Sequence, residues 1–359
     1  MAVYIGYLLL AGLQIPLFKE KNGINDNCFN KNAYLSLCCI ELIILVGIRG
    51  YTIGADTEVY LAALNHYSGL SLSEVLTAKL VWPFDFEWGY FALTKLCSWA
   101  NLGNTSFLFI IAIIIYIPLF KTIKKYSLIP YVSILCYFAL GMFTYSLGIF
   151  RQMIAISIVL CGWNYIVERK LWKYIIVVGI AMLFHTTAII AIVLYILYGI
   201  NWERITWLLL GIEIFLLLFG RTAVGIALKL FPKYIGFVGG KYDQQGGSYI
   251  MLILLNVILF VSVFYMKKNN AQERMTICAL ILAVCCQAIG YSMAIFGRIV
   301  PYFSIYIMFA IPNIIVNIDN RWRIQATTII ILFLFALTYL EFDGNKYVTP
   351  YYTFFQSIR

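Results

Sequence analysis

Long apolar runs dominate the chain, and they limit the folds that it can adopt. Charged or turn residues separate about ten runs that approach the roughly 20 apolar residues of a membrane-crossing helix, at 2–18, 33–48, 104–120, 129–148, 149–167, 205–220, 248–266, 275–296, 299–318 and 325–340. Only 12% of the 359 residues are charged, whereas soluble domains carry about 25%. The sequence therefore predicts an all-α, polytopic transmembrane helical bundle that forms a single domain over residues 1–359.

The positions of the basic residues indicate the membrane topology of this bundle. The formal net charge is +10, but the lysines and arginines form short groups between apolar runs, which is typical of the positive-inside rule and not of a nucleic-acid-binding protein. The groups at 19–31, 121–125, 169–173, 204, 267–274 and 321–323 can all be cytoplasmic only if the run 173–199 returns to the side that it entered from. We therefore predict a broken or re-entrant helix pair that meets near His185, giving about 11–12 helical segments in all. Because broken helices at membrane depth border protein or a wet cavity, this pair is expected to border the working site.

This threading places three polar stretches on the outer side. They are the loops 49–103 and 221–247 and the C-terminal tail 341–359, and the first begins with the polar segment from Arg49 to Tyr60. Residues 90–100 are mildly apolar and predict an amphipathic helix in contact with membrane lipids at the interface. The outer side is therefore where we expect a polar substrate to bind.

Four arginines lie at the outer ends of apolar runs, where the positive-inside rule does not account for them: Arg49, Arg151, Arg221 and Arg298. A cation in apolar surroundings is costly and usually faces a cavity or a partner. A guanidinium group can bind two phosphate oxygens at once, so these arginines, together with Lys233 and Lys241, predict a site for a pyrophosphate-bearing ligand. The structural alternative for each arginine is a local ion pair or a side chain that extends to the membrane interface.

Two carboxylates and one histidine are the candidates for acid–base chemistry. Asp56 and Glu87 lie beside glycine or aromatic residues in the first outer loop and can accept a proton from an attacking hydroxyl. His185 lies in a run with no other ionisable group, and an ionisable residue at that depth is a functional candidate. The alternatives are a solvated or arginine-paired carboxylate, including an Arg49–Asp56 pair, and a hydrogen-bonded structural histidine. The sequence shows no spacing typical of a metal site, and no cofactor is expected.

Aromatic residues are abundant, at 17% of the chain. Many are expected in the two interfacial belts of a membrane protein. Those on the outer side can equally stack against sugars, and the candidates are Tyr51, Tyr60, Trp88, Tyr90, Tyr234 and Tyr242. Sequence alone does not divide these residues between the two roles.

Several short motifs, in this order and spacing, resemble the Wzy/EpsG-type family of bacterial polysaccharide polymerases, which make O-antigen, capsule and exopolysaccharide. The motifs are Arg49-Gly50-Tyr51, Gly54-Ala55-Asp56-Thr57 with Tyr60, Glu87-Trp88-Gly89-Tyr90, Phe150 to Ala155, Glu168-Arg169-Lys170, Ala181 to Ala188, and Arg298 before an aromatic-rich span. The resemblance covers about residues 30–315. One departure is the Gly54-Ala55 pair before Asp56, where the family often has a small residue followed by Thr or Ser.

The resemblance implies a metal-independent glycosyltransferase with a GT-C-like bundle in the bacterial inner membrane, its site facing the periplasm or the cell exterior. Such an enzyme transfers a growing glycan from undecaprenyl pyrophosphate to the non-reducing end of another lipid-linked repeat unit. In these terms the arginines would hold the pyrophosphate, Asp56 or Glu87 would deprotonate the acceptor, and His185 would shape or polarise the site. A chain-length regulator is a further partner that the resemblance implies.

Two other functions use similar chemistry. A flippase for a lipid-linked oligosaccharide also needs a cationic cavity, but it usually shows repeat symmetry, and no repeat is evident in this sequence. An O-antigen ligase uses the same donor with a different acceptor, so sequence separates it only weakly from a polymerase; the lack of one dominant large outer loop favours the polymerase.

Overall fold

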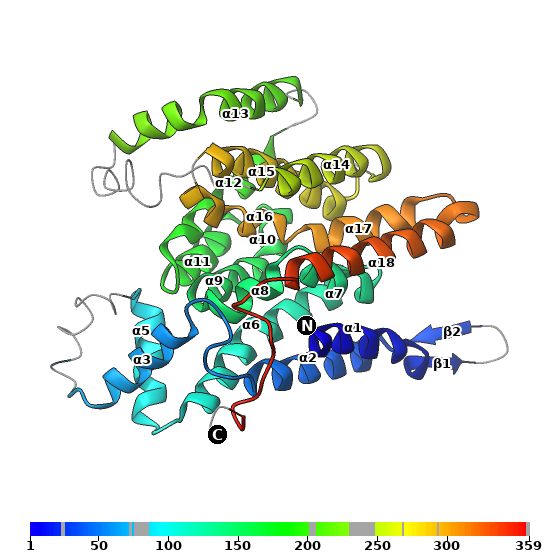
Figure 1. Ribbon diagram of the computed structural model, residues 1–359. Helices are drawn as coiled ribbons and strands as arrows, with labels where there is room; N and C mark the ends of the chain where they lie inside the picture. The colour runs from blue at the N-terminus through cyan, green and yellow to red at the C-terminus, as the bar shows by residue number, and fades with distance from the viewer. Residues whose placement is uncertain are drawn as a thin grey trace. The chain divides into compact units, whose positions relative to one another are not determined.

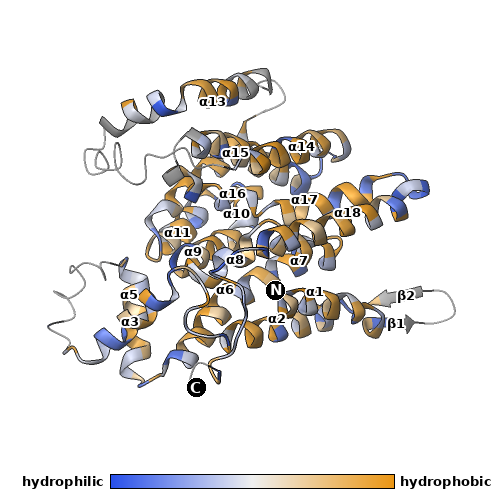
Figure 2. Ribbon diagram, in the orientation of Figure 1, coloured by the Kyte–Doolittle hydropathy of each residue, from blue (hydrophilic) through white to orange (hydrophobic). Residues whose placement is uncertain are grey.

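The computed structural model describes residues 1–22, 26–71, 74, 86–200, 206–229, 248–267, 269–292 and 294–356. Apart from turns and one antiparallel β-hairpin, β1 (Lys19–Asn22) with β2 (Asp26–Phe29), these residues form helices (Figure 1). Most residues of these helices are apolar, as Figure 2 shows. The predicted fold class, an all-α membrane protein, is therefore confirmed.

The chain forms two compact units. The first contains Met1–Gly162, Ile176–Ile189 and Ile324–Arg359, and the second contains Trp163–Ile175 and Ile190–Arg323. A single transmembrane domain over residues 1–359 stays a prediction.

In the first unit, helix α6 is the central element. It packs against α2 on one side and α9 on another, while α3 and α5 pack against each other (Figure 1). Buried residues in α6 recur at intervals of three and four, from Phe107 to Ile111 and Ile115, because that spacing keeps side chains on one face of an α-helix. The helical elements that lie wholly or mostly in this unit are α1 (Ala2–Leu13), η1 (Ile15–Phe18), α2 (Lys31–Gly47), α3 (Thr57–Ser68), α5 (Trp88–Trp99), α6 (Asn104–Tyr126), α7 (Pro130–Ala139), α8 (Met142–Gly148), α9 (Phe150–Cys161) and α18 (Asn320–Phe342).

In the second unit, helix α15 is the central element, and α13 and α14 pack against it. Trp163, which is fully buried, lies against Tyr306 and Phe309. The helical elements of this unit are α10 (Trp163–Val167), the end of η2 (Thr186–Ala191), α12 (Ile192–Gly199), α13 (Thr206–Lys229), α14 (Tyr249–Tyr265), α15 (Ala271–Ser292), η5 (Ala294–Ile299), α16 (Pro301–Ser304) and α17 (Ile307–Asn317). Helix α11 (Leu171–Met182) and η2 each have residues in both units.

The predicted broken helix pair is present. Helix α11 ends at Met182, and η2 begins at Thr186 and leads into α12. The two legs lie side by side, because the Tyr174 hydroxyl donates to the Ala191 carbonyl at 2.9 Å and the Tyr174 ring stacks on Tyr195. The chain therefore reverses direction next to His185, as the distribution of basic residues predicted.

The predicted number of about ten full spans is not confirmed. Among the described residues, four helices are long and apolar enough to cross a membrane, or five if the bent pair α7–α8 forms one span. Five other apolar helical segments in this part of the chain are 10–17 residues long. One of them, α9, ends at Gly162 after 12 residues, a length of about 18 Å. Hydropathy identified the runs correctly, but it did not show where each helix ends.

Contacts between loops match the predicted threading. On the side predicted to be cytoplasmic, Lys31 Nζ of the first unit donates to the Ser127 carbonyl at 2.5 Å. On the side predicted to be outer, the Gly50 N–H donates to the Tyr352 carbonyl at 2.8 Å, so the first outer loop and the C-terminal tail lie together. Which membrane face each side occupies stays a prediction.

Candidate functional site

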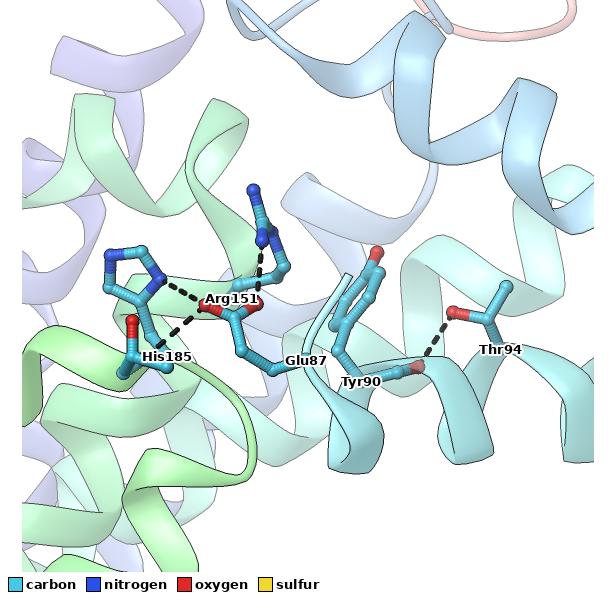
Figure 3. A network of polar contacts seen from close by, with 6 residues as sticks. Glu87, Tyr90, Thr94, Arg151 and His185 are labelled. Atoms are coloured by element: carbon cyan, nitrogen blue, oxygen red, sulfur yellow. Dashed lines mark hydrogen bonds and ion pairs between the residues drawn. The ribbon is translucent and has the colours of Figure 1, made fainter. Parts of the chain in front are cut away.

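Three ionisable side chains from distant parts of the sequence meet in the first unit (Figure 3). Arg151 Nη1 lies 2.5 Å from Glu87 Oε2, and His185 Nδ1 lies 3.0 Å from Glu87 Oε1. Glu87 and His185 are largely buried, while the Arg151 side chain is 26% exposed. All three were predicted site residues, and the structure brings them together.

Local backbone geometry places the Glu87 carboxylate against the break of the helix pair. Glu87 is the N-cap of α5, and the next turn is docked because the Gly89 N–H donates to the Leu183 carbonyl at 2.7 Å. A β-carbon at Gly89 would lie 2.7 Å from that carbonyl oxygen, so only glycine fits this approach. The N-terminus of η2 leaves backbone N–H groups without a helical partner, and the Thr186 N–H donates to Glu87 Oε1 at 3.3 Å.

The surroundings of Glu87 keep its carboxylate ionised. Burial by itself raises the pKa of Glu87, but the hydrogen bond from His185 and the charge of Arg151 outweigh burial and lower the pKa to about 2. A carboxylate with so low a pKa is a weak base at neutral pH. Both of its oxygens are also engaged, so the geometry disfavours Glu87 as the group that deprotonates an acceptor.

The ionised carboxylate defines which nitrogen of His185 carries the proton. An ionised carboxylate only accepts hydrogen bonds, so Nδ1 of His185 must be the donor in the contact with Glu87. In a neutral imidazole the other nitrogen, Nε2, then holds a free lone pair. No described residue donates a hydrogen bond to Nε2, and this nitrogen points away from Glu87 (Figure 3).

Aromatic rings enclose the Arg151 side of the cluster. The Arg151 guanidinium carbon lies 4.8 Å from the centre of the Phe86 ring, and Tyr60 is close enough for its hydroxyl to interact with the guanidinium. Tyr60 and Tyr90 are 2% and 0% exposed and pack against each other and against Phe86. Both tyrosines therefore support the cluster from the interior, and sugar contact by either residue stays a prediction.

Two other predicted sugar-binding residues are more accessible. Trp88 follows Glu87 directly and is 51% exposed, in edge contact with Phe91. Tyr51 is half-buried, and its hydroxyl lies 2.9 Å from the Thr105 hydroxyl. Of the aromatic candidates in the described residues, Trp88 is the most exposed, and it follows Glu87 in the chain.

Arg49 lies apart from any open surface. It is 1% exposed, and its guanidinium donates to the backbone carbonyls of Val46, Ile53 and Leu147 at 2.6, 3.4 and 3.1 Å. Burial lowers the pKa of Arg49 to about 10, which still leaves it charged at neutral pH. These contacts favour a structural role over pyrophosphate binding, and Arg49 does not pair with Asp56.

Asp56 is exposed at the N-cap of α3, one helical turn before Tyr60. Its charge acts on Tyr60, as do the charges of Arg151 and Glu87, so Asp56 lies near the cluster. The described residues form no ion pair with Asp56. It remains an accessible carboxylate beside the site, and its role stays a prediction.

The remaining predicted residues lie in the second unit or outside the described residues. Arg221 in α13 and Arg298 in η5 are exposed and belong to the second unit. Lys233, Lys241, Tyr234 and Tyr242 lie outside the described residues. A shared site for all four arginines therefore stays a prediction.

Sequence reasoning did not select Phe86, Phe150 or Thr186, although each contacts a candidate residue or its neighbours. The sequence signals were adjacency, since each lies directly beside Glu87, Arg151 or His185, and, for Phe150 and Thr186, a place within the family motifs. For metals, no three His, Cys, Asp or Glu side chains gather anywhere in the part of the chain that the structure describes. Metal independence stays a prediction.

Comparison with known proteins agrees with the motifs around this cluster. The model of the EpsG family matches residues 32–353, which is most of the chain and includes Glu87, Arg151 and His185. The chain belongs to the EpsG family. Neither a curated protein nor a solved structure matches it. The resemblance to Wzy/EpsG-type polysaccharide polymerases is thus confirmed, and membership of the EpsG family indicates a polysaccharide polymerase or a related glycosyltransferase in a bacterial membrane.

Proposed function

We propose that this EpsG-family protein is a polysaccharide repeat-unit polymerase. It transfers the growing glycan from undecaprenyl pyrophosphate to the non-reducing end of another lipid-linked repeat unit, at the outer face of the bacterial inner membrane. Family membership supports the polymerase class. The observation that carries the residue assignment is the Glu87 carboxylate shared between Arg151 and His185.

In this proposal His185 is the general base. Glu87 accepts the Nδ1 proton and so fixes the tautomer with a basic Nε2, as a carboxylate does for the histidine of a hydrolytic triad. Nε2 takes the proton of the acceptor hydroxyl while the acceptor oxygen forms the new bond to the anomeric carbon of the donor. Asp56 is the alternative base, because it is exposed and near the same cluster.

Arg151 stabilises the leaving group. The bond between the anomeric carbon and the pyrophosphate oxygen breaks, and its electron pair stays on the lipid pyrophosphate as that group departs. Arg151 uses Nη1 for Glu87, but its side chain is 26% exposed and a guanidinium carries five N–H donors, so donor capacity is left for phosphate oxygens. A fixed cation placed where negative charge develops in the transition state lowers the activation barrier for loss of the pyrophosphate. Arg221, Arg298, Lys233 and Lys241 are proposed to extend the cationic surface for the two carriers.

The acceptor sugar is proposed to stack on Trp88. This ring is exposed and follows Glu87 in the chain, which supports the proposal. Tyr51 is proposed to contribute at the edge of the same surface.

The test is complementation of a bacterial strain that lacks its polymerase, with the polysaccharide resolved on a gel. The wild-type chain should restore a ladder of lengths. Arg151→Ala should abolish the ladder at normal membrane levels of protein, whereas the control Arg321→Ala, at a side chain that is 75% exposed, should keep it.

Other outcomes separate the alternative functions. One added repeat unit without a ladder would mean that the polymerase step is missing, and loss of lipid-linked sugar from the outer face in the absence of the protein would indicate a flippase. A normal ladder with Arg151→Ala would refute the assignment of the pyrophosphate site.

A further inference from the structure

One backbone carbonyl in the first unit receives two side-chain donors from the polar segment that begins at Arg49. The Leu147 carbonyl accepts from Arg49 Nη2 at 3.1 Å, and the single proton of Thr57 Oγ1 is shared between the Leu147 carbonyl at 2.9 Å and the Ile53 carbonyl at 2.8 Å. Thr57 and Arg49 are 0% and 1% exposed, so water does not compete for these bonds. Leu147 lies in α8, four residues before Arg151, and the two donors therefore fix the backbone that leads into α9.

Glycines allow this segment to approach α8 closely. Gly54 has a φ of +103°, and a β-carbon there would lie 2.0 Å from the Leu147 carbonyl oxygen. A β-carbon at Gly148 would lie 2.5 Å from the Ala55 nitrogen. Backbone therefore packs on backbone at this junction, which leaves little freedom for the start of α9.

The residue before Arg151 is held from two sides. Phe150 is fully buried, with the Arg49 guanidinium carbon 5.4 Å from its ring centre and the Tyr60 ring stacked on it at 4.7 Å. Because Phe150 cannot turn, the direction of the next side chain along α9 is set. That direction leads Arg151 to Glu87 and over Phe86.

We infer that Thr57 and Arg49 are positioning residues, which act on the reaction through Leu147 and Phe150 by fixing Arg151. This inference rests on the proposed function only in one respect, which is that Arg151 binds the lipid pyrophosphate. It explains why a buried arginine that contacts only backbone carbonyls and an aromatic ring lies in the same motif as the accessible Asp56. Displacing a catalytic group by about 1 Å can lower the reaction rate by about 100-fold. A small shift of the backbone at this junction should therefore lower the rate strongly.

The test compares Thr57→Val with Thr57→Ser in the purified full-length protein. Valine keeps the branched shape and removes the hydroxyl, whereas serine keeps the hydroxyl. The matched control is Thr338→Val, because Thr338 is equally buried and its hydroxyl bonds only within its own helix, to the Leu334 carbonyl. Two quantities are measured: kcat for chain extension and the Kd for undecaprenyl pyrophosphate in detergent micelles.

Thr57→Val should lower kcat and weaken undecaprenyl pyrophosphate binding by about 10-fold or more, while Thr57→Ser and Thr338→Val stay within about 2-fold of the wild type. In an Arg151→Ala background, Thr57→Val should not weaken undecaprenyl pyrophosphate binding further, because coupled residues are not additive. Equal losses for Thr57→Val and Thr338→Val, or a full further loss in the Arg151→Ala background, would overturn the inference.

The binding measurement keeps this inference separate from the proposed function. If the wild type binds undecaprenyl pyrophosphate but extends no chain, the proposed function fails, and the Kd values of the Thr57 variants still decide the positioning role. If chain extension is normal in the wild type and in Thr57→Val, the positioning role fails and the proposed function stands.

Discussion

Replacing Glu87 with glutamine changes both neighbours of the carboxylate at once. The charged Arg151 attracts the amide oxygen, so the amide nitrogen turns toward His185 and the Thr186 N–H. The Thr186 donor then faces another donor. His185 must accept at Nδ1, which transfers its own proton to Nε2 and removes the lone pair that the proposed mechanism uses.

The cost to stability follows from the pKa of Glu87. Lowering this pKa from 4.5 to about 2 corresponds to about 3 kcal/mol between the charged and neutral carboxyl. Solvent screening reduces that value, since the Glu87 and Arg151 side chains are 13% and 26% exposed, and we expect Glu87→Gln to cost about 2 kcal/mol. For chain extension, the wrong tautomer predicts a loss of about 1,000-fold or more.

The pH dependence of stability gives an independent check. The folded-state pKa of Glu87 is depressed, so its contribution is present above the unfolded value of 4.5 and is lost as the pH falls toward about 2. The difference in unfolding free energy between wild type and Glu87→Gln should therefore be constant near neutral pH and shrink as the pH falls below about 5.

The assays are denaturant unfolding of the purified protein over this pH range and chain extension at neutral pH. Glu58→Gln is the control, because Glu58 is exposed in the first turn of α3 and lies in the same unit. A Glu87→Gln protein with wild-type chain extension would refute the role of Glu87 in fixing His185. A stability difference that does not change on acidification would refute the electrostatic account.

Three further substitutions test neighbouring steps of the argument. His185→Asn keeps a donor toward Glu87 but removes Nε2, so it should abolish chain extension while the Kd for undecaprenyl pyrophosphate stays near that of the wild type; a ladder on the gel would contradict this. Asp56→Asn should reduce kcat by less than about 10-fold if His185 is the base, and a complete loss would favour Asp56 instead. Gly54→Ala should lower the free energy of unfolding by about 2 kcal/mol or more, seen as a lower unfolding midpoint and a lower yield, because φ is +103° and the added carbon meets the Leu147 carbonyl. The β-carbon of Gly69→Ala meets no atom within 4 Å, so this control should be tolerated.

The sequence by itself determined the class of protein and the approximate course of the chain. Apolar runs placed most helices, because the cost of exposing backbone and polar groups to lipid depends on local composition. The distribution of lysine and arginine predicted the reversal near His185, and the same reasoning singled out Arg151 as an anomalous cation. Motif order gave the family, and the EpsG family match confirms it.

Only the tertiary structure decided what each candidate residue contacts. Glu87 lies 64 residues from Arg151 and 98 from His185 along the chain, and no local pattern encodes whether such residues meet. The low pKa of Glu87 and the tautomer of His185 are properties of that meeting and not of either residue. Packing also separated Arg49, which the sequence grouped with Arg151, from the cluster, because the carbonyls of Val46, Ile53 and Leu147 satisfy its guanidinium in the interior. Charge and position in the sequence identify which residues are unusual, whereas burial and the available partners decide whether an unusual residue supports the site or forms part of it.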